Sequence, residues 1–196
     1  MDIEIIASKI ADAATLFNRI VGGGLSLEEL TVDELKTKIE KQYHIALEEV
    51  EETEKALVDV DIIETFDGAV DSLYTVEPLL DMLDIYCDGV GITSLGDLDN
   101  HFELPLSELL SRYRELNLED LDLETLYKAA DLIIENNQQK FTTDVEVFST
   151  WKSAYNRTSV IIDGVEYYFL KDNNNKVKKR DGFVNVNLNV LFEDKL

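Results

Sequence analysis

The stretch from Thr31 to Val58 reads TVDELKTKIEKQYHIALEEVEETEKALV. Its apolar residues recur at helical spacing and form a single stripe, made up of Leu35, Ile39, Tyr43, Ala46, Val50 and Leu57. Thr31 is followed three residues later by Glu34, which is the pattern of a capping box at a helix start. The stretch therefore predicts one long helix over about 32–58.

Helical spacing also extends to both sides of this helix. The expected helices or helical segments are 2–20, one that begins near Asp61 and that Pro78 should kink or split, 105–116, 122–138 and 144–156. Three glycines at 22–24 end the first of these, and residues 89–96 read as a loop because Gly89, Gly91 and Gly96 recur there.

The pattern changes near the end of the chain. In residues 159–170, SVIIDGVEYYFL, two β-rich runs flank Asp163-Gly164, which is a strong signal for a hairpin. Residues 173–183, NNNKVKKRDGF, predict a second turn followed by a basic strand. The fold class is therefore mainly α, a helical bundle with a small C-terminal β-hairpin appendage. We expect residues 1–156 to form the bundle and 157–196 to complete the same domain.

Composition excludes several classes of function. The net charge of −23 argues against binding to nucleic acid or to an anionic membrane. No apolar run reaches the roughly 18 residues of a membrane span, and the N-terminus lacks the basic region of a signal peptide. Cys87 is the single cysteine, so an internal disulfide and a cysteine-based zinc site are both excluded. We expect a cytoplasmic protein, in the host cytoplasm if the gene is a phage gene.

Two groups of carboxylates follow the apolar stripes. Glu49 and Glu52 lean toward the stripe of the long helix, whereas Glu48 and Glu51 point further outward and Glu54 reads as a solvated residue. On the next helix Glu64, Asp67 and Asp71 share one face. If the two helices pack as antiparallel neighbours, these acids face each other.

Facing carboxylates repel one another, which favours protonation unless a cation is bound. Oxygen ligands suit Mg²⁺, with Mn²⁺ as the alternative, and a Mg²⁺ site that retains waters suggests a phosphorylated substrate. The competing interpretation is a solvated helix face, because acidic pairs at helical spacing arise often by chance in a chain with 41 acids.

The residues also resemble a known family. Glu48, Glu49 and Glu52, followed by DGAVDSLYTV from Asp67 to Val76, resemble the MazG-like all-α nucleoside triphosphate pyrophosphohydrolases. Within these they are most similar to the phage-type branch described as phosphoribosyl-ATP pyrophosphohydrolase-like. ENNQQKFT, from Glu135 to Thr142, is similar to a downstream segment of that branch and would match Asn137 and Lys140.

The basic segment NKVKKRDGFVNVNL, from Asn175 to Leu188, is similar to the C-terminal segment of the branch and would match Lys176 and Lys179. The sequence departs from the family at Asn175, where a glycine is expected. The acids Asp67 and Asp71 are spaced by four residues rather than three. Glu64 is therefore an alternative member of the site.

The resemblance implies a hydrolase that cleaves a nucleoside or deoxynucleoside triphosphate to the monophosphate and pyrophosphate. It implies Glu49, Glu52, Asp67 and Asp71 as Mg²⁺ ligands, and Glu48 or Glu49 as the base that takes a proton from water. Asn137, Lys140, Lys176 and Lys179 would bind the phosphates. The implied assembly is a homodimer or homotetramer.

Two other functions remain open on this fold. The net charge of −23 also fits a non-catalytic acidic interaction protein, such as a nucleic-acid mimic or an inhibitor of a basic partner. A nucleotide-binding module without catalysis would retain the same residues. For the lysines, a solvated turn is the competing role, and for Asn137 a helix C-cap.

Overall fold

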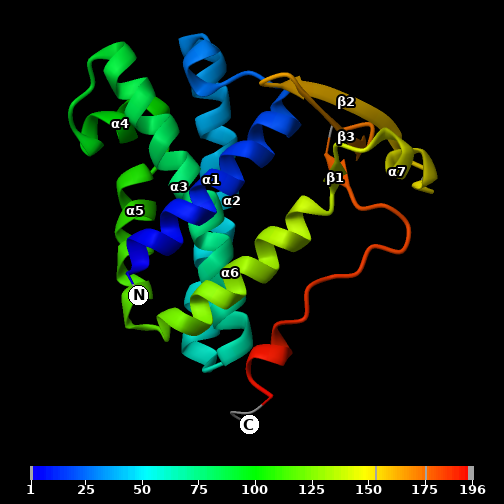
Figure 1. Cartoon of the computed structure of the whole chain (residues 1–196). Coiled ribbons are helices and arrows are strands. Elements are labelled where there is room, and N and C mark those ends of the chain that lie inside the picture. The colour runs from blue at the N-terminus through cyan, green and yellow to red at the C-terminus, as the bar shows by residue number, and fades with distance from the viewer. Residues whose placement is uncertain (1, 153, 175, 194–196) are drawn as a thin grey trace.

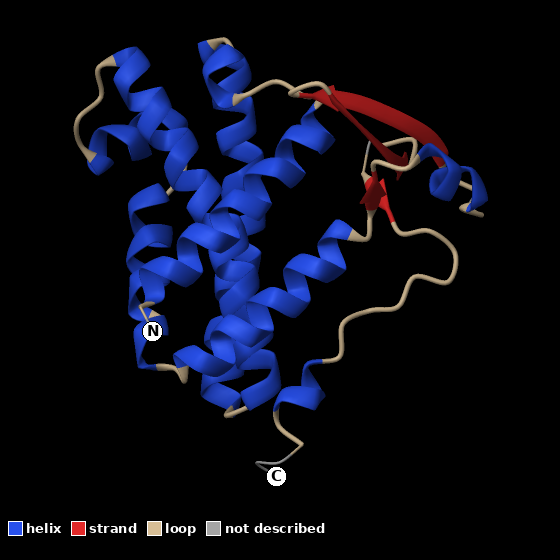
Figure 2. Cartoon of the chain, viewed as in Figure 1, coloured by secondary structure: helices blue, strands red, loops and turns tan. Residues whose placement is uncertain are grey.

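The computed structural model describes residues 2–152, 154–174 and 176–193. Over these ranges the chain forms seven α-helices and a four-stranded antiparallel sheet (Figures 1 and 2). The sequence-based expectation of a mainly α fold with a small C-terminal β element is confirmed. Among the described residues, every helix is too short or too polar to cross a membrane.

A hairpin of two long helices forms the centre of the bundle. α2 (Val32–Asp59) begins at the predicted capping box, in which the Thr31 N–H donates to Glu34 Oε2 at 2.9 Å and the Glu34 N–H donates to Thr31 Oγ1 at 3.3 Å. Asp61 is the N-cap of α3 (Ile62–Val90). The predicted split at Pro78 is absent, since α3 is one helix that contains this proline.

Three further helices cover this hairpin. α1 (Ile3–Gly22) crosses α3, α6 (Leu123–Gln138) packs on α1 and α3, and α5 (Leu106–Glu115) packs on α2. α4 (Leu95–Phe102) contacts α5, begins at the end of the predicted 89–96 loop and extends through residues for which no helix was predicted. Two short 3-10 turns, Leu27–Glu29 and Leu118–Asp120, connect neighbouring helices.

The sheet lies at one end of the bundle, beside the C-terminal ends of α1 and α6 (Figure 1). β2 (Asn156–Ile162) and β3 (Val165–Lys171) form the predicted hairpin, with positive φ at Asp163 and Gly164. β1 (Phe141–Thr142) and β4 (Val177–Lys178) pair with the other edge of β3. α7 (Val145–Thr150) is shorter than the predicted 144–156 segment.

The C-terminal segment returns from the sheet to the bundle (Figure 2). The 3-10 turn Leu188–Leu191 packs on α6 and α3, and the Phe192 ring lies 5.4 Å from the Phe66 ring. Leu188 and Phe192 are buried in the main core, whereas Leu57, predicted for the α2 stripe, is 37% exposed. The family-based departure at Asn175 lies outside the described residues.

Candidate functional site

Four carboxylates gather where α2 and α3 face each other. α2 supplies Glu49 and Glu52, and α3 supplies Asp67 and Asp71. Glu49, Asp67 and Asp71 are half-buried, while Glu52 is exposed. The structure therefore brings the two predicted acidic pairs into one patch, with the exposed Glu48 and Glu64 at its edges.

A close contact between the helices sets the spacing of this patch. A Cβ built on Gly68 would lie 2.6 Å from Thr53 Oγ1, so α3 approaches α2 as closely as it does because residue 68 is glycine. Beside it the Thr53 and Ser72 hydroxyls are hydrogen-bonded at 2.9 Å. Gly68 lies next to Asp67, and Thr53 lies next to Glu52, so this contact also holds the acids opposite each other.

The four carboxylates form no direct contact with a protein group of opposite charge. Among the described residues, their carboxylate oxygens accept no hydrogen bond within 3.5 Å and form no ion pair within 4 Å. The hydrogen bonds that Glu49 and Asp71 accept from threonine hydroxyls go to their backbone carbonyls, and the nearby ion pair on α2 involves Glu54. In the described part of the chain, Arg19 Nε is the one side-chain nitrogen or oxygen that is fully buried and has no hydrogen-bond partner. Because the carboxylate oxygens of Glu49, Asp67 and Asp71 also have no such partner, they must be accessible to solvent. These side chains are thus open to a ligand.

Burial and mutual repulsion raise the pKa of three of these acids. Burial, followed by Glu52, Glu48 and Asp67, raises the pKa of Glu49 to about 7. The pKa of Asp71 also rises to about 7, from burial and then from Glu49 and Asp67. The pKa of Asp67 rises through burial and then through Glu64 and Glu52. The patch therefore favours protons or another cation.

The donor set fits Mg²⁺ by its chemistry, because four carboxylates whose charge is uncompensated supply hard oxygen ligands. Over residues 2–152, 154–174 and 176–193, however, no group of three or more His, Cys, Asp or Glu side chains is arranged so that it could hold a metal ion. The carboxylates interact electrostatically without forming a closed protein cage. An ion that keeps several waters and takes oxygens from a bound phosphate needs only one or two of them.

A cluster of lysines borders the carboxylates. Lys140 follows α6, is half-buried, and donates from Nζ to Asn137 Oδ1 at 2.5 Å. Burial lowers the pKa of the Lys140 ammonium, Lys179 lowers it further, Asp71 raises it, and Lys176 lowers it again. The structure therefore brings Lys176 and Lys179 close to Lys140 and Asp71, from which they are distant in the sequence.

The lysines are tethered in different ways. Lys179 Nζ donates to Asn185 Oδ1 at 2.5 Å and lies 4.8 Å from the centre of the Phe183 ring. Lys176 is exposed and its backbone N–H donates to the Asp172 carboxylate. Asn137 Oδ1 accepts a hydrogen bond from Lys140, and the contact of its amide NH2 group with phosphate stays a prediction. The C-cap of α6 is Gln139, not Asn137.

An aromatic cluster beside Lys140 was not recognised in the sequence. Lys140 Nζ lies 5.5 Å from the centre of the Phe17 ring, and Phe17 contacts both Tyr74 and Phe141 with ring centroids 6.4 Å apart. The Tyr74 hydroxyl donates to the Ala13 carbonyl at 3.3 Å. Tyr74 follows Asp71 by three residues on one helix, and this spacing is the signal that could have placed it at the site.

The outward acids of α2 have a structural role. Arg112 of α5 donates to both oxygens of Glu54, at 2.9 and 2.6 Å, and to Glu51 at 3.2 Å. This pairing lowers the pKa of Glu54. The expectation that Glu51 and Glu54 are only solvated is therefore wrong, because both accept hydrogen bonds from Arg112, which connect α5 to α2.

No protein-family model matches the chain, and comparisons with curated proteins and with solved structures give no significant match.

Proposed function

We propose that the protein is a Mg²⁺-dependent nucleotide pyrophosphohydrolase that cleaves a nucleoside or deoxynucleoside triphosphate into the monophosphate and pyrophosphate. The observation that carries this proposal is the patch of unpartnered carboxylates on α2 and α3 with a lysine cluster at its border. Carboxylates alone would suit many cations. The adjoining lysines favour a ligand that brings a Mg²⁺ ion together with a chain of phosphates.

Each group of residues has a distinct task in this proposal. Glu49, Glu52, Asp67 and Asp71 would hold the ion, directly or through its waters. Bound Mg²⁺ would screen the phosphate charge and make an attacking water more acidic. Lys140, Lys176 and Lys179 would neutralise phosphate oxygens, and Asn137 would hold the Lys140 ammonium in place.

The hydrolytic step requires one proton acceptor. The water oxygen forms a bond to the α-phosphorus, the bond from that phosphorus to the α–β bridging oxygen breaks, and pyrophosphate leaves. Glu49 suits the role of acceptor better than Glu48, because Glu49 is half-buried with a pKa raised to about 7 and Glu48 is exposed. Its carboxylate would accept the proton of the attacking water.

We also propose a homodimer or homotetramer. The turn between α2 and α3 carries aliphatic residues that remain exposed in the single chain, with Val58 81%, Val60 85% and Ile62 48% exposed. Such a cluster supports association through an uncharged surface in a chain whose net charge of −23 opposes it elsewhere. Sedimentation analysis at two protein concentrations would measure the assembly.

The direct experiment is an assay of pyrophosphate release from the common ribonucleoside and deoxyribonucleoside triphosphates. It compares Mg²⁺, Mn²⁺ and EDTA. We expect release of pyrophosphate and a nucleoside monophosphate with metal only, and a loss of at least about 100-fold in Asp71→Asn and Glu52→Gln. Asp88→Asn is the matched control, because Asp88 is exposed on the same helix as Asp71.

The result also separates the alternative functions. Release of orthophosphate in place of pyrophosphate would overturn the assignment of the cleaved bond. If no triphosphate is hydrolysed but one binds with Mg²⁺, the protein is a nucleotide-binding module. If no triphosphate binds and the chain instead binds a basic protein in a manner that high salt disrupts, the protein is a non-catalytic acidic interaction protein.

A further inference from the structure

A second candidate site lies away from the carboxylate patch. A cavity of about 410 Å³ opens between α1, the loop and 3-10 turn that follow it, one residue of α2 and the second half of α3. None of the four site carboxylates lines it. Its volume falls in the range of pockets that hold small molecules.

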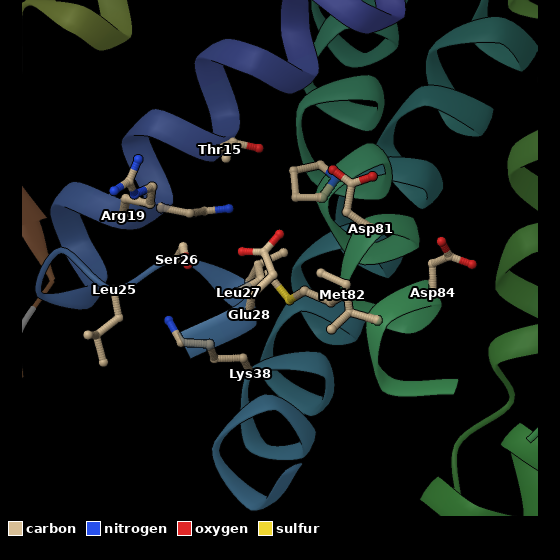
Figure 3. Close-up of a pocket in the computed structure, with 13 residues that line it drawn as sticks. Thr15, Arg19, Leu25, Ser26, Leu27, Glu28, Lys38, Asp81, Met82 and Asp84 are labelled. Atoms are coloured by element: carbon tan, nitrogen blue, oxygen red, sulfur yellow. The ribbon is translucent and has the colours of Figure 1, made fainter. Parts of the chain in front are cut away.

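The walls of the cavity are of two kinds (Figure 3). Leu27, Pro78, Met82 and Ile85 provide apolar surface. Figure 3 shows Arg19 and Lys38 on one side and Asp81 on the opposite side, with Met82 and Glu28 between them. The cavity therefore combines apolar and polar surface and carries opposite charges on its two sides.

Two charged side chains of this cavity, Lys38 and Asp81, have no protein partner. Arg19 is already engaged, because it binds the Asp163 carboxylate through both terminal nitrogens, at 2.9 and 3.1 Å, and its Nε is buried. Within the described residues neither the Lys38 ammonium nor the Asp81 carboxylate forms a hydrogen bond or an ion pair within 4 Å; the ion pairs of the protein involve other groups. Lys38 is half-buried, and burial lowers the pKa of its ammonium, whereas Asp81 is exposed, and its pKa is raised by partial burial and then by the neighbouring Asp84.

The other charged group in the middle of the cavity is already engaged. The pKa of Glu28 is lowered by its own backbone N–H and by the Ser26 hydroxyl, with Arg19 adding a smaller attraction. Lys38 and Asp81 are opposite in charge and do not form an ion pair with each other. A ligand that compensates both must therefore carry two charges and span the distance between them.

We propose that this cavity binds a small zwitterion whose amino and carboxylate groups are separated by an apolar segment, such as an ω-amino acid. Its carboxylate is placed against Lys38, and its ammonium against Asp81. The apolar segment lies along Pro78 and Met82. A ligand with a single charge would pair with only one of the two protein charges.

Three matched compounds test this assignment by calorimetry on the full chain. 6-Aminohexanoate carries both charges, hexanoate carries only the carboxylate, and hexylamine carries only the ammonium. We expect 6-aminohexanoate to bind at least about tenfold more tightly than either analogue, since each lost charged hydrogen bond weakens binding by about that factor. The shorter 5-aminopentanoate should bind as a second zwitterion.

Substitutions locate the site. Lys38→Met and Asp81→Asn should each lower the affinity for 6-aminohexanoate by about tenfold. Asp88→Asn and the active-site variant Asp71→Asn should leave it unchanged, which separates this site from the proposed hydrolase. Met82 lines the cavity in a chain with two methionines, so its methyl resonance in the wild-type protein should shift when the compound is added.

Three outcomes would overturn the proposal. They are no binding by either zwitterion, binding of hexylamine or hexanoate as tight as that of 6-aminohexanoate, and binding that leaves the Met82 methyl resonance unmoved. The last measurement uses the wild-type chain, so it decides the question even if a variant fails to fold.

Discussion

Replacing Asp71 by asparagine should stabilise the metal-free protein while abolishing its activity. The substitution keeps the shape of the side chain and removes a charge that is half-buried, unpartnered and repelled by Glu49 and Asp67. A residue that only maintains the fold would behave in the opposite way, because its loss would lower stability. The sign of the change in stability therefore distinguishes a residue of the functional site from a residue that maintains the fold.

The magnitude follows from the pKa of Asp71, which rises from an ordinary 3.8 to about 7. One pH unit of difference corresponds to 1.36 kcal/mol, so full ionisation of Asp71 in the fold costs up to ~4 kcal/mol. Part of that cost is shared with Glu49, which repels the same charge and can take up a proton in its place. We expect the free energy of unfolding of Asp71→Asn to exceed that of the wild type by about 1–3 kcal/mol above pH 7.5.

The dependence on pH has a definite sign. The folded protein binds the Asp71 proton more tightly than the unfolded chain, so wild-type stability from this group is complete below pH ~4. It is lost as the pH rises from about 4 to about 7, which is the folded pKa. The advantage of Asp71→Asn should therefore grow over this window and then level off.

Urea unfolding followed by circular dichroism measures this difference. The experiment uses EDTA, one fixed protein concentration and buffers from pH 4.5 to 8. Asp88→Asn is again the control and should show no gain that depends on pH. Added Mg²⁺ should stabilise the wild type and have a smaller effect on Asp71→Asn. A less stable Asp71→Asn variant at pH 8 in EDTA, or a gain that does not vary with pH, would refute this reasoning.

Other contacts give equally direct predictions. Gly68→Ala should lower the free energy of unfolding by about 1–3 kcal/mol in urea, because its Cβ would lie 2.6 Å from Thr53 Oγ1. Gly89→Ala on the same helix should not lower it, because nothing lies within 4 Å of that Cβ; equal effects of the two would contradict the close approach of α2 and α3. Lys140→Met should raise KM for the triphosphate about tenfold with a smaller change in kcat, whereas Lys128→Met should change neither, as steady-state kinetics would reveal. Gly164→Ala should cost about 1 kcal/mol of thermal stability, because residue 164 has φ +82°, and pyrophosphate release should remain at the wild-type rate.

Much of the secondary structure was predictable because its signals are local. The capping box at Thr31, the stripe of α2 and the Asp163-Gly164 turn each act within a few residues, and each appears as expected apart from Leu57 of the stripe, which is exposed. Prediction failed where tertiary packing prevailed. The split expected at Pro78 is absent from α3, and residues 95–102 form α4, whose buried Leu98 and Phe102 anchor it to the core despite three nearby glycines.

The sequence by itself determined the helical phase of the acids. Spacing along α2 and α3 placed Glu49, Glu52, Asp67 and Asp71 beside the apolar stripes, because side-chain direction within one helix depends only on residue number. Only the tertiary structure decided how these acids are perturbed. Burial between two helices in contact at Gly68 raises the pKa of Glu49 and Asp71 to about 7, and burial depends on segments that the sequence does not show to be neighbours.

The same division applies to the positive charges. The sequence marked a basic segment near the C-terminus, yet only the fold brings Lys176 and Lys179 next to Lys140 and Asp71. It does so because β4 pairs with β3, and β1, which follows Lys140, pairs with the same edge of β3. Contacts of this kind join residues distant in the chain, so no local pattern encodes them. The cavity between Lys38 and Asp81 belongs to the same class, since it exists only once α1, α2 and α3 have packed.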